Sequence, residues 1–199
     1  MIFDSKITPR FFKAIFGKTG KDKYQAAKLD PYSHALESIS HSHAEVHEGN
    51  YYRSGMNFTL ANAEVATFGL TTPDSKKWIH ITWSLSTSAD GVFDLLEDVT
   101  SFAGGASCIP LNHNRNSKSC SDAVCVKGMT GADLVVPTGG TTILSAILTT
   151  GKGVVVDRGV TEEFILKQNS NYLFRYTNGT SANVIRLFIE GYEEESAGA

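Results

Sequence analysis

Residues 78–85 of the chain, WIHITWSL, alternate apolar and polar side chains without interruption from Ile79 to Leu85. Because successive side chains of a strand point to opposite faces of a sheet, this pattern predicts a strand with one buried face. A turn at residues 89–91, Ala-Asp-Gly, separates it from a second strand candidate at residues 92–99, VFDLLEDV. The predicted buried face of the first strand consists of Ile79, Ile81, Trp83 and Leu85.

Similar segments occur through most of the chain. Short stretches of alternating hydrophobicity recur from about residue 33 onward, separated by turn residues. About eight to ten short strands, with almost no helix outside the N-terminal segment, predict an all-β fold, a jelly roll or β-sandwich. The further strand candidates are residues 50–60, 63–70, 122–129, 141–150, 164–166, 171–177 and 182–192.

The N-terminal segment has a different pattern and predicts a helical arm. Thr8 is a suitable N-cap, Pro9 suits the first helical position, and Gly17 is a suitable C-terminal stop. A polar, lysine-rich linker follows. Large apolar side chains fall on roughly one face of this helix, and a short helix cannot bury them by itself. They are Phe11, Phe12, Ile15 and Phe16.

The net charge of −3 conceals an uneven distribution. The first 30 residues contain seven basic and three acidic side chains, which gives +4. The remainder contains 11 basic and 18 acidic side chains, which gives −7. We therefore divide the chain into a basic arm at residues 1–32, a β-domain at residues 33–193 and an acidic, small-residue tail at residues 194–199.

Composition and motifs exclude several classes of protein. No run of about 18 apolar residues predicts a membrane span, and the N-terminus lacks the pattern of a secretory signal. We expect production in a reducing cytoplasm, with free thiols in structural roles at Cys108, Cys120 and Cys125. Because the chain has no nucleophile elbow, C-x-x-C pair or phosphate-binding loop, we expect neither a catalytic residue nor a cofactor.

The densest group of potential metal ligands lies at residues 41–48, HSHAEVHE. The pattern resembles the first metal-binding motif of the cupins, β-barrels in which histidines and a glutamate bind a divalent metal. In a strand, His41, His43, Glu45 and His47 share one face, but Glu48 lies on the other. The chain also lacks the second cupin motif. We therefore expect no bound metal, and a metal-binding protein of the cupin type stays open as an alternative.

Residues 110–117, PLNHNRNS, form a polar stretch between strands. Asparagine side chains at positions 112, 114 and 116 can stabilise turns by bonding their own backbone. Arg115 can pair with a carboxylate of another subunit. The candidate subunit or loop contacts are His47, Asn114, Arg115 and Asn116.

Four ordered segments resemble a family of small virion proteins of tailed bacteriophages. The shared patterns are H-x-G, TP-x-x-x-K-x-x-H, N-x-N-R-N-S and E-x-x-L-x-x-x-x-x-Y-x-x-x-x-x-N. The segments are VHEGNYYRSG (residues 46–55), TTPDSKKWIHITWSLS (71–86), IPLNHNRNS (109–117) and TEEFILKQNSNYLFRYTN (161–178). This resemblance implies a capsid decoration, or cement, protein with a jelly-roll β-fold. It implies binding to the outer face of the major capsid protein lattice as a trimer or other small homo-oligomer, without catalysis.

The arm lies outside the matched region, so its role comes from its residues alone. A capped, apolar helix on a polar linker favours docking onto a partner protein over binding nucleic acid. Two other functions stay open: a head-fibre, receptor-binding or glycan-binding β-module, and the metal-binding alternative above. The candidate capsid-binding residues are Arg10, Phe11, Phe12, Lys13, Ile15, Phe16 and Lys18.

Overall fold

The structure is a computed structural model that describes residues 18–19, 23–24, 41–131, 133–149, 154–158, 163–179 and 182–195. Its contacts divide the chain into two units, Met1–His41 with Ala197–Ala199, and Ser42–Ser196. In the first unit, the described elements are β1 (Lys18–Thr19) and β2 (Lys23–Tyr24), which pair antiparallel. The predicted arm helix lies outside the described residues.

The second unit contains a short helix and twelve strands among its described residues, and the alternating segments of the sequence supply most of them. The elements are α2 (His41–Glu48), β3 (Tyr51–Leu60), β4 (Val65–Thr71), β5 (Lys77–Thr87), β6 (Gly91–Ala103), β7 (Ala106–Cys108), β8 (Leu111–Asn112), β9 (Val124–Met129), β10 (Val136–Leu148), β11 (Val154–Arg158), β12 (Phe164–Leu166), β13 (Asn171–Asn178) and β14 (Asn183–Glu195).

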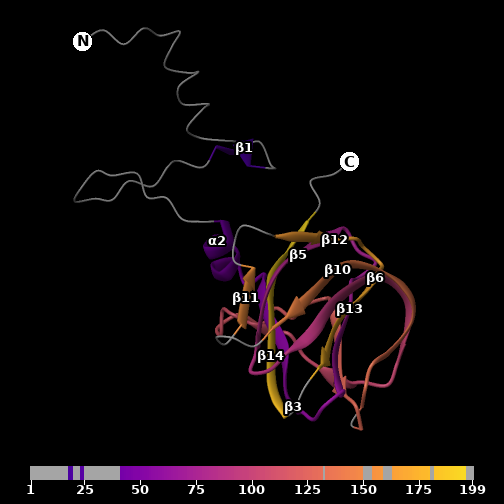
Figure 1. Ribbon diagram of the computed structural model, residues 1–199. Coiled ribbons are helices and arrows are strands. Elements are labelled where there is room, and N and C mark those ends of the chain that lie inside the picture. Colours follow the sequence, from indigo (N-terminus) through magenta and orange to yellow (C-terminus); the bar gives the residue numbers. More distant parts are fainter. Residues whose placement is uncertain are drawn as a thin grey trace, which may run out of the picture. The chain divides into compact units, whose positions relative to one another are not determined.

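The strands form two antiparallel sheets that face each other (Figure 1). The first sheet has the order β10-β6-β13-β4-β9-β7. The second has the order β11-β5-β14-β3-β8, with β12 also pairing with β5. From β3 to β6, successive strands alternate between the second and the first sheet, and β13 and β14 do the same. The predicted all-β architecture is therefore confirmed in its broad form.

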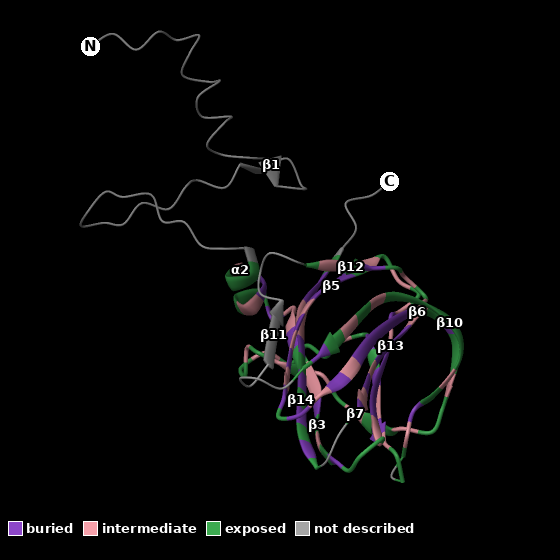
Figure 2. Cartoon of the chain, in the orientation of Figure 1, coloured by how far each residue is buried: buried purple, intermediate pink, exposed green. Residues whose placement is uncertain are grey.

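The main core lies between the two sheets, where their buried positions, purple in Figure 2, meet. The predicted inner face of β5 is confirmed, because all four of its apolar side chains are buried. Trp83 on this face meets Phe174 of the opposite sheet edge to face, with ring centroids 5.9 Å apart. Phe174 in turn contacts Phe68 at 6.2 Å. Such aromatic pairs add to the stability that burial supplies.

The structure differs from the sequence predictions in three places. Residues 41–48 form a helix rather than a strand. β7, β8 and β11 were not predicted, and the first two are too short to show a period of two. β10 begins at residue 136, five residues before the predicted segment, because irregular pairing around Gly139 and Gly140 interrupts the alternation there.

A buried polar network joins the two sheets where β5, β13 and β14 come together. The Asn183 side chain donates to Thr87 Oγ1 and to the Tyr176 hydroxyl, both at 2.7 Å. Its Oδ1 accepts from the backbone N–H of Ser88 at 2.9 Å, and the Tyr176 hydroxyl donates to the Ala89 carbonyl at 3.0 Å. Because these groups are buried, each needs its partner to offset the loss of water.

We expect Asn183→Ala to lower the free energy of unfolding by about 2–3 kcal/mol, because it leaves several buried polar groups without partners. Urea unfolding measures this loss, and the slope of the transition should not change. The matched control is Asn57→Ala in β3, where the side chain is exposed. It should change the stability by less than about 0.5 kcal/mol. Equal losses in the two variants would contradict the role of the network.

Candidate functional site

The four segments that carry the resemblance come together at one end of the β-domain. Antiparallel register places the starts of β3, β5 and β13 at the same end as the finish of β4 and β14. The backbone N–H of Thr72 donates to the Ser170 carbonyl at 2.9 Å, which extends the β4–β13 pairing by one residue at this end. The chain therefore has its candidate site where these strand ends meet.

Two of the segments, residues 71–86 and 161–178, pair directly. His80 Nδ1 lies 2.9 Å from a carboxylate oxygen of Glu163. The Thr72 hydroxyl lies 2.7 Å from the Lys167 carbonyl, to which it donates. In the quoted patterns, His80 and Thr72 belong to one motif and Glu163 to another. Their side chains hold the start of β5 to the β12–β13 turn.

The other two segments, residues 46–55 and 109–117, also pair. Asn112 Nδ2 donates to the Gly49 carbonyl at 2.7 Å, and Asn114 Nδ2 donates to the His47 carbonyl at 3.2 Å. Both acceptors lie at the C-terminal end of α2, where carbonyl groups have no partner within the helix. The asparagine-rich loop thus supplies hydrogen-bond donors for the end of α2.

Residues 41–48 form a helix and not the strand face on which a cupin-type motif depends, and the end of α2 shows the physical reason. Gly49 has a φ of +81°, the left-handed conformation that commonly follows a helix. Its N–H donates to the Val46 carbonyl and the N–H of Asn50 donates to the Glu45 carbonyl, which together form a Schellman motif. The Asn50 side chain also donates to the Glu45 carboxylate at 3.1 Å. Gly49 was the signal in the sequence that indicates a helix end.

The helix also changes the arrangement of the histidines. His43 and His47 lie one turn apart on an exposed face, and their Nε2 atoms are 2.9 Å apart. Two imidazoles are fewer than the three or four protein ligands typical of zinc sites. Among the described residues, no group of three or more histidine, cysteine or acidic side chains is arranged to hold a metal.

The asparagine loop confirms part of its prediction. Asn112 Oδ1 accepts from the backbone N–H of Asn114 at 2.8 Å, and Asn114 Oδ1 accepts from that of Asn116 at 3.1 Å. These are the predicted side-chain-to-backbone turns. Arg115 donates to the Asn112 carbonyl at 3.5 Å. Its contact with another subunit, like those of His47, Asn114 and Asn116, stays a prediction.

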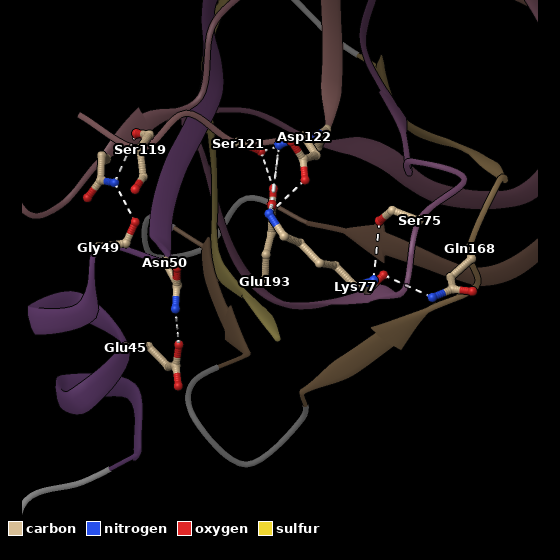
Figure 3. A network of polar contacts seen from close by, with 12 residues as sticks. Glu45, Gly49, Asn50, Ser75, Lys77, Ser119, Ser121, Asp122, Gln168 and Glu193 are labelled. Carbon is tan, nitrogen blue, oxygen red and sulfur yellow. Dashed lines mark hydrogen bonds and ion pairs between the residues drawn. The ribbon is translucent and has the colours of Figure 1, made fainter. Parts of the chain in front are cut away.

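A buried carboxylate holds the far end of the same loop (Figure 3). Glu193, on β14, is 5% exposed and accepts from the Ser121 hydroxyl and from the backbone N–H of Asp122. Lys77, on β5, lies 2.7 Å from Asp122 and 3.6 Å from Glu193. The hydrogen bond to Asp122 raises the pKa of Lys77 above its usual value, so the ammonium stays charged. Lys77 is the lysine of the quoted pattern TP-x-x-x-K-x-x-H, whereas Glu193 lies outside all four segments and was missed by sequence analysis.

A row of rings crosses the second sheet next to this network. His80, Tyr192 and Tyr51 are register partners on β5, β14 and β3. His80 stacks on Tyr192 with centroids 4.5 Å apart, and His113 meets Tyr51 edge to face at 4.8 Å. Burial and a hydrogen bond to Glu163 raise the pKa of the Tyr192 hydroxyl, so it stays neutral. The polar motif residues thus hold a partly aromatic outer face in place.

A groove of about 430 Å³ runs along the open edge of the sandwich. Residues of β3, β7, β8, β9 and β14 line it, among them Cys108, Lys127 and Phe188. Ile109 and Leu111 at its rim are 77% and 58% exposed. An apolar rim of this kind on a soluble surface is typical of a contact with another molecule.

Other predicted site residues lie elsewhere. Of the candidate capsid-binding residues, Lys18 falls in β1, and those from Arg10 to Phe16 lie outside the described residues. The three cysteines are unbonded, but Cys108 and Cys125 are register partners on β7 and β9, which sequence spacing could not indicate. Within the described part of the chain, no helix is long and apolar enough to cross a membrane.

We find no known protein family, curated protein or solved structure that matches the chain.

We expect Glu193→Ala to free the segment between β8 and β9, because Ser121 and the Asp122 N–H lose their acceptor. The free energy of unfolding should fall by about 2 kcal/mol, since hydrogen bonds to a charged carboxylate are lost. Limited proteolysis under native conditions should cut near residues 113–123 faster than in the unaltered protein.

The matched control for this prediction is Glu48→Ala, because Glu48 is exposed at the end of α2. Its proteolysis rate near residues 113–123 should equal that of the unaltered protein. If Glu193→Ala were cut there no faster than Glu48→Ala, Glu193 would not be the anchor of the loop.

Proposed function

We propose that this protein is a structural virion protein that decorates the capsid of a tailed phage by binding the outer surface of the major capsid protein lattice. The observation that carries the proposal is the pairing of the motif residues with one another. The motif histidines, asparagines, threonine and glutamate lie far apart in the sequence but bond in two adjacent groups. Motif residues that bond to one another stabilise the fold. We therefore expect proteins that share these motifs to share a fold and a structural role.

The proposal includes a jelly-roll fold, and the order of strand pairing supports it. A jelly roll has eight strands that nest as two Greek keys. Here β3 pairs with β14, β4 with β13, β5 with β12 and β6 with β10, so that each pair encloses the next. β7, β8 and β9 are then an insertion between the fourth and fifth strands of the nest. This insertion carries the asparagine loop and the rim of the groove.

A decoration role also fits the physical properties of the β-domain. A capsid repeats the same binding surface many times, so modest contacts add through symmetry and avidity. The apolar rim at Ile109 and Leu111 offers such a contact to the capsid or to another copy of the chain in a trimer or other small homo-oligomer. The arm face of Phe11, Phe12, Ile15 and Phe16 offers a second.

We expect the purified full-length chain to co-sediment with phage heads that lack it. Electron microscopy of those heads should show added density at regular positions on the outer shell. Density on a tail or a fibre, or binding to glycans in an array without binding to heads, would overturn the proposal in favour of a receptor-binding or glycan-binding module.

The arm is tested in the same assay with Phe11, Phe12, Ile15 and Phe16 changed together to serine in the full chain. Because the lost contact is apolar, we expect the affinity for heads to fall at least about tenfold. Val184→Ser, which alters an exposed apolar residue of β14, is the control and should bind normally. Unchanged binding of the arm variant would show that the arm is not the docking element.

A further inference from the structure

A pair of cysteines lies at the edge of the first sheet, where β7 pairs with β9. Antiparallel register places Cys108 directly opposite Cys125, so both side chains lie on the same face. The Cα atoms of opposed residues in such pairs are about 4.5–5.5 Å apart, within the range that a disulfide spans. This pairing brings the two thiols close enough for each to shift the pKa of the other. A bond between the sulfurs therefore requires little movement of the backbone.

The two thiols have different surroundings. Cys125 is 2% exposed and belongs to the apolar core between the sheets. Cys108 is half-buried and lines the groove at the edge of the sandwich. The Ser54 hydroxyl on the facing sheet lies 3.9 Å from the Cys108 sulfur and donates to it. A reagent entering the groove thus reaches Cys108 first, with Cys125 behind it.

The surroundings also favour the reactive form of Cys108. The hydrogen bond from the Cys125 thiol, with smaller effects from Ser54 and Lys127, lowers the pKa of Cys108 to about 7 despite partial burial. The same hydrogen bond, together with burial, raises the pKa of Cys125. Near pH 7, Cys108 is therefore the nucleophilic thiolate and Cys125 keeps its proton.

The groove itself suits a small anionic reagent. Its volume of about 430 Å³ lies in the range of small-molecule sites. Its described lining residues include two cations, Lys127 and Arg53, the second of which also pairs with Glu190 at 3.2 Å. Small cellular disulfides such as glutathione disulfide carry carboxylates, which these cations attract.

We propose that Cys108 and Cys125 form a dithiol site that reduces small, carboxylate-bearing disulfides and is itself converted to a cross-strand disulfide. The Cys108 thiolate attacks one sulfur of the small disulfide, forming a mixed disulfide and releasing one small thiolate. Cys125 then loses its proton and attacks the Cys108 sulfur, which releases the second small thiolate. The protein loses two electrons, the small disulfide gains them, and the protons pass to the two released thiolates.

The bond would also fix the edge of the sandwich. It would tie β7 covalently to β9 and close the loop that contains the asparagine-rich residues. A closed loop of this length restricts the unfolded chain, so the oxidised protein should unfold about 5 °C or more above the reduced protein. The chemistry does not depend on the proposed capsid role.

The test uses the full-length chain with Cys120→Ser, which removes the exposed third thiol. After treatment with glutathione disulfide, mass spectrometry of the intact protein should show the loss of two hydrogens and no retained glutathione. Peptide mapping should join Cys108 to Cys125, and dithiothreitol should reverse the change. A chain that stays reduced, or that keeps one glutathione, would overturn the proposal.

Two further variants separate the roles of the thiols. With Cys125→Ala added, one glutathione should remain attached at Cys108, because no second thiol releases it. With Cys108→Ala added instead, Cys125 should stay unmodified. Modification of Cys125 at the rate of Cys108 would overturn the assigned order of reaction. If the buried substitution prevents folding, the mass and mapping of the Cys120→Ser protein still decide whether the cross-link forms.

The pH dependence provides an independent readout. In the Cys120→Ser protein, the rate of alkylation of Cys108 by iodoacetamide should reach half its maximum near pH 7. With Cys125→Ala, the midpoint should move toward the ordinary thiol value, about 8.5, because the hydrogen bond from Cys125 is lost. An unchanged midpoint in a folded variant would contradict the role of Cys125 in activating Cys108.

Discussion

The sandwich depends on the position of the last two strands of the chain in the middle of the sheets. β13 pairs with β4 on one side and β6 on the other, and β14 pairs with β3 and β5. The N-terminal strands therefore cannot complete either sheet until residues 171–195 are in place. This constraint makes most contacts long-range, which favours slow, cooperative folding. It also brings segments from both halves of the chain to the same end of the domain.

At that end, backbone groups that the sheets leave unpaired are bonded by side chains. Asn112 and Asn114 supply donors to the end of α2, and Glu193 accepts from the start of the segment that leads into β9. Each of these bonds gives a partner to a backbone group that the helix and the sheets leave unpaired. These asparagine and glutamate side chains thus stabilise loops, which agrees with the proposed decoration role.

The proposed dithiol site lies at the open edge of the same insertion. An edge strand such as β7 is held by one neighbour, so it is less constrained than a central strand. Ser54 on the facing sheet and Lys127 on β9 give Cys108 a polar setting while Cys125 remains in the core. A covalent bond there would strengthen the weakest side of the sandwich without changing its fold.

The sequence by itself determined the positions of the long strands, the buried face of β5 and the asparagine turns of residues 112–116. These features depend on alternation and on bonds between near neighbours, which are local properties of the chain. Gly49 indicates a helix end locally, but the sequence did not determine what holds α2 in place, because donors to its last carbonyl groups come from a loop more than 60 residues away.

Only the tertiary structure decided the pairing of His80 with Glu163, of Cys108 with Cys125, and of Glu193 with the loop before β9. Each pairing follows from the register between strands that are distant in the sequence. A shift of one residue would turn the side chains to the opposite face, and local alternation does not specify which distant strand is the partner. Strand register therefore brings the residues of the candidate site together, whereas the hydrophobic pattern of the sequence specifies the fold class.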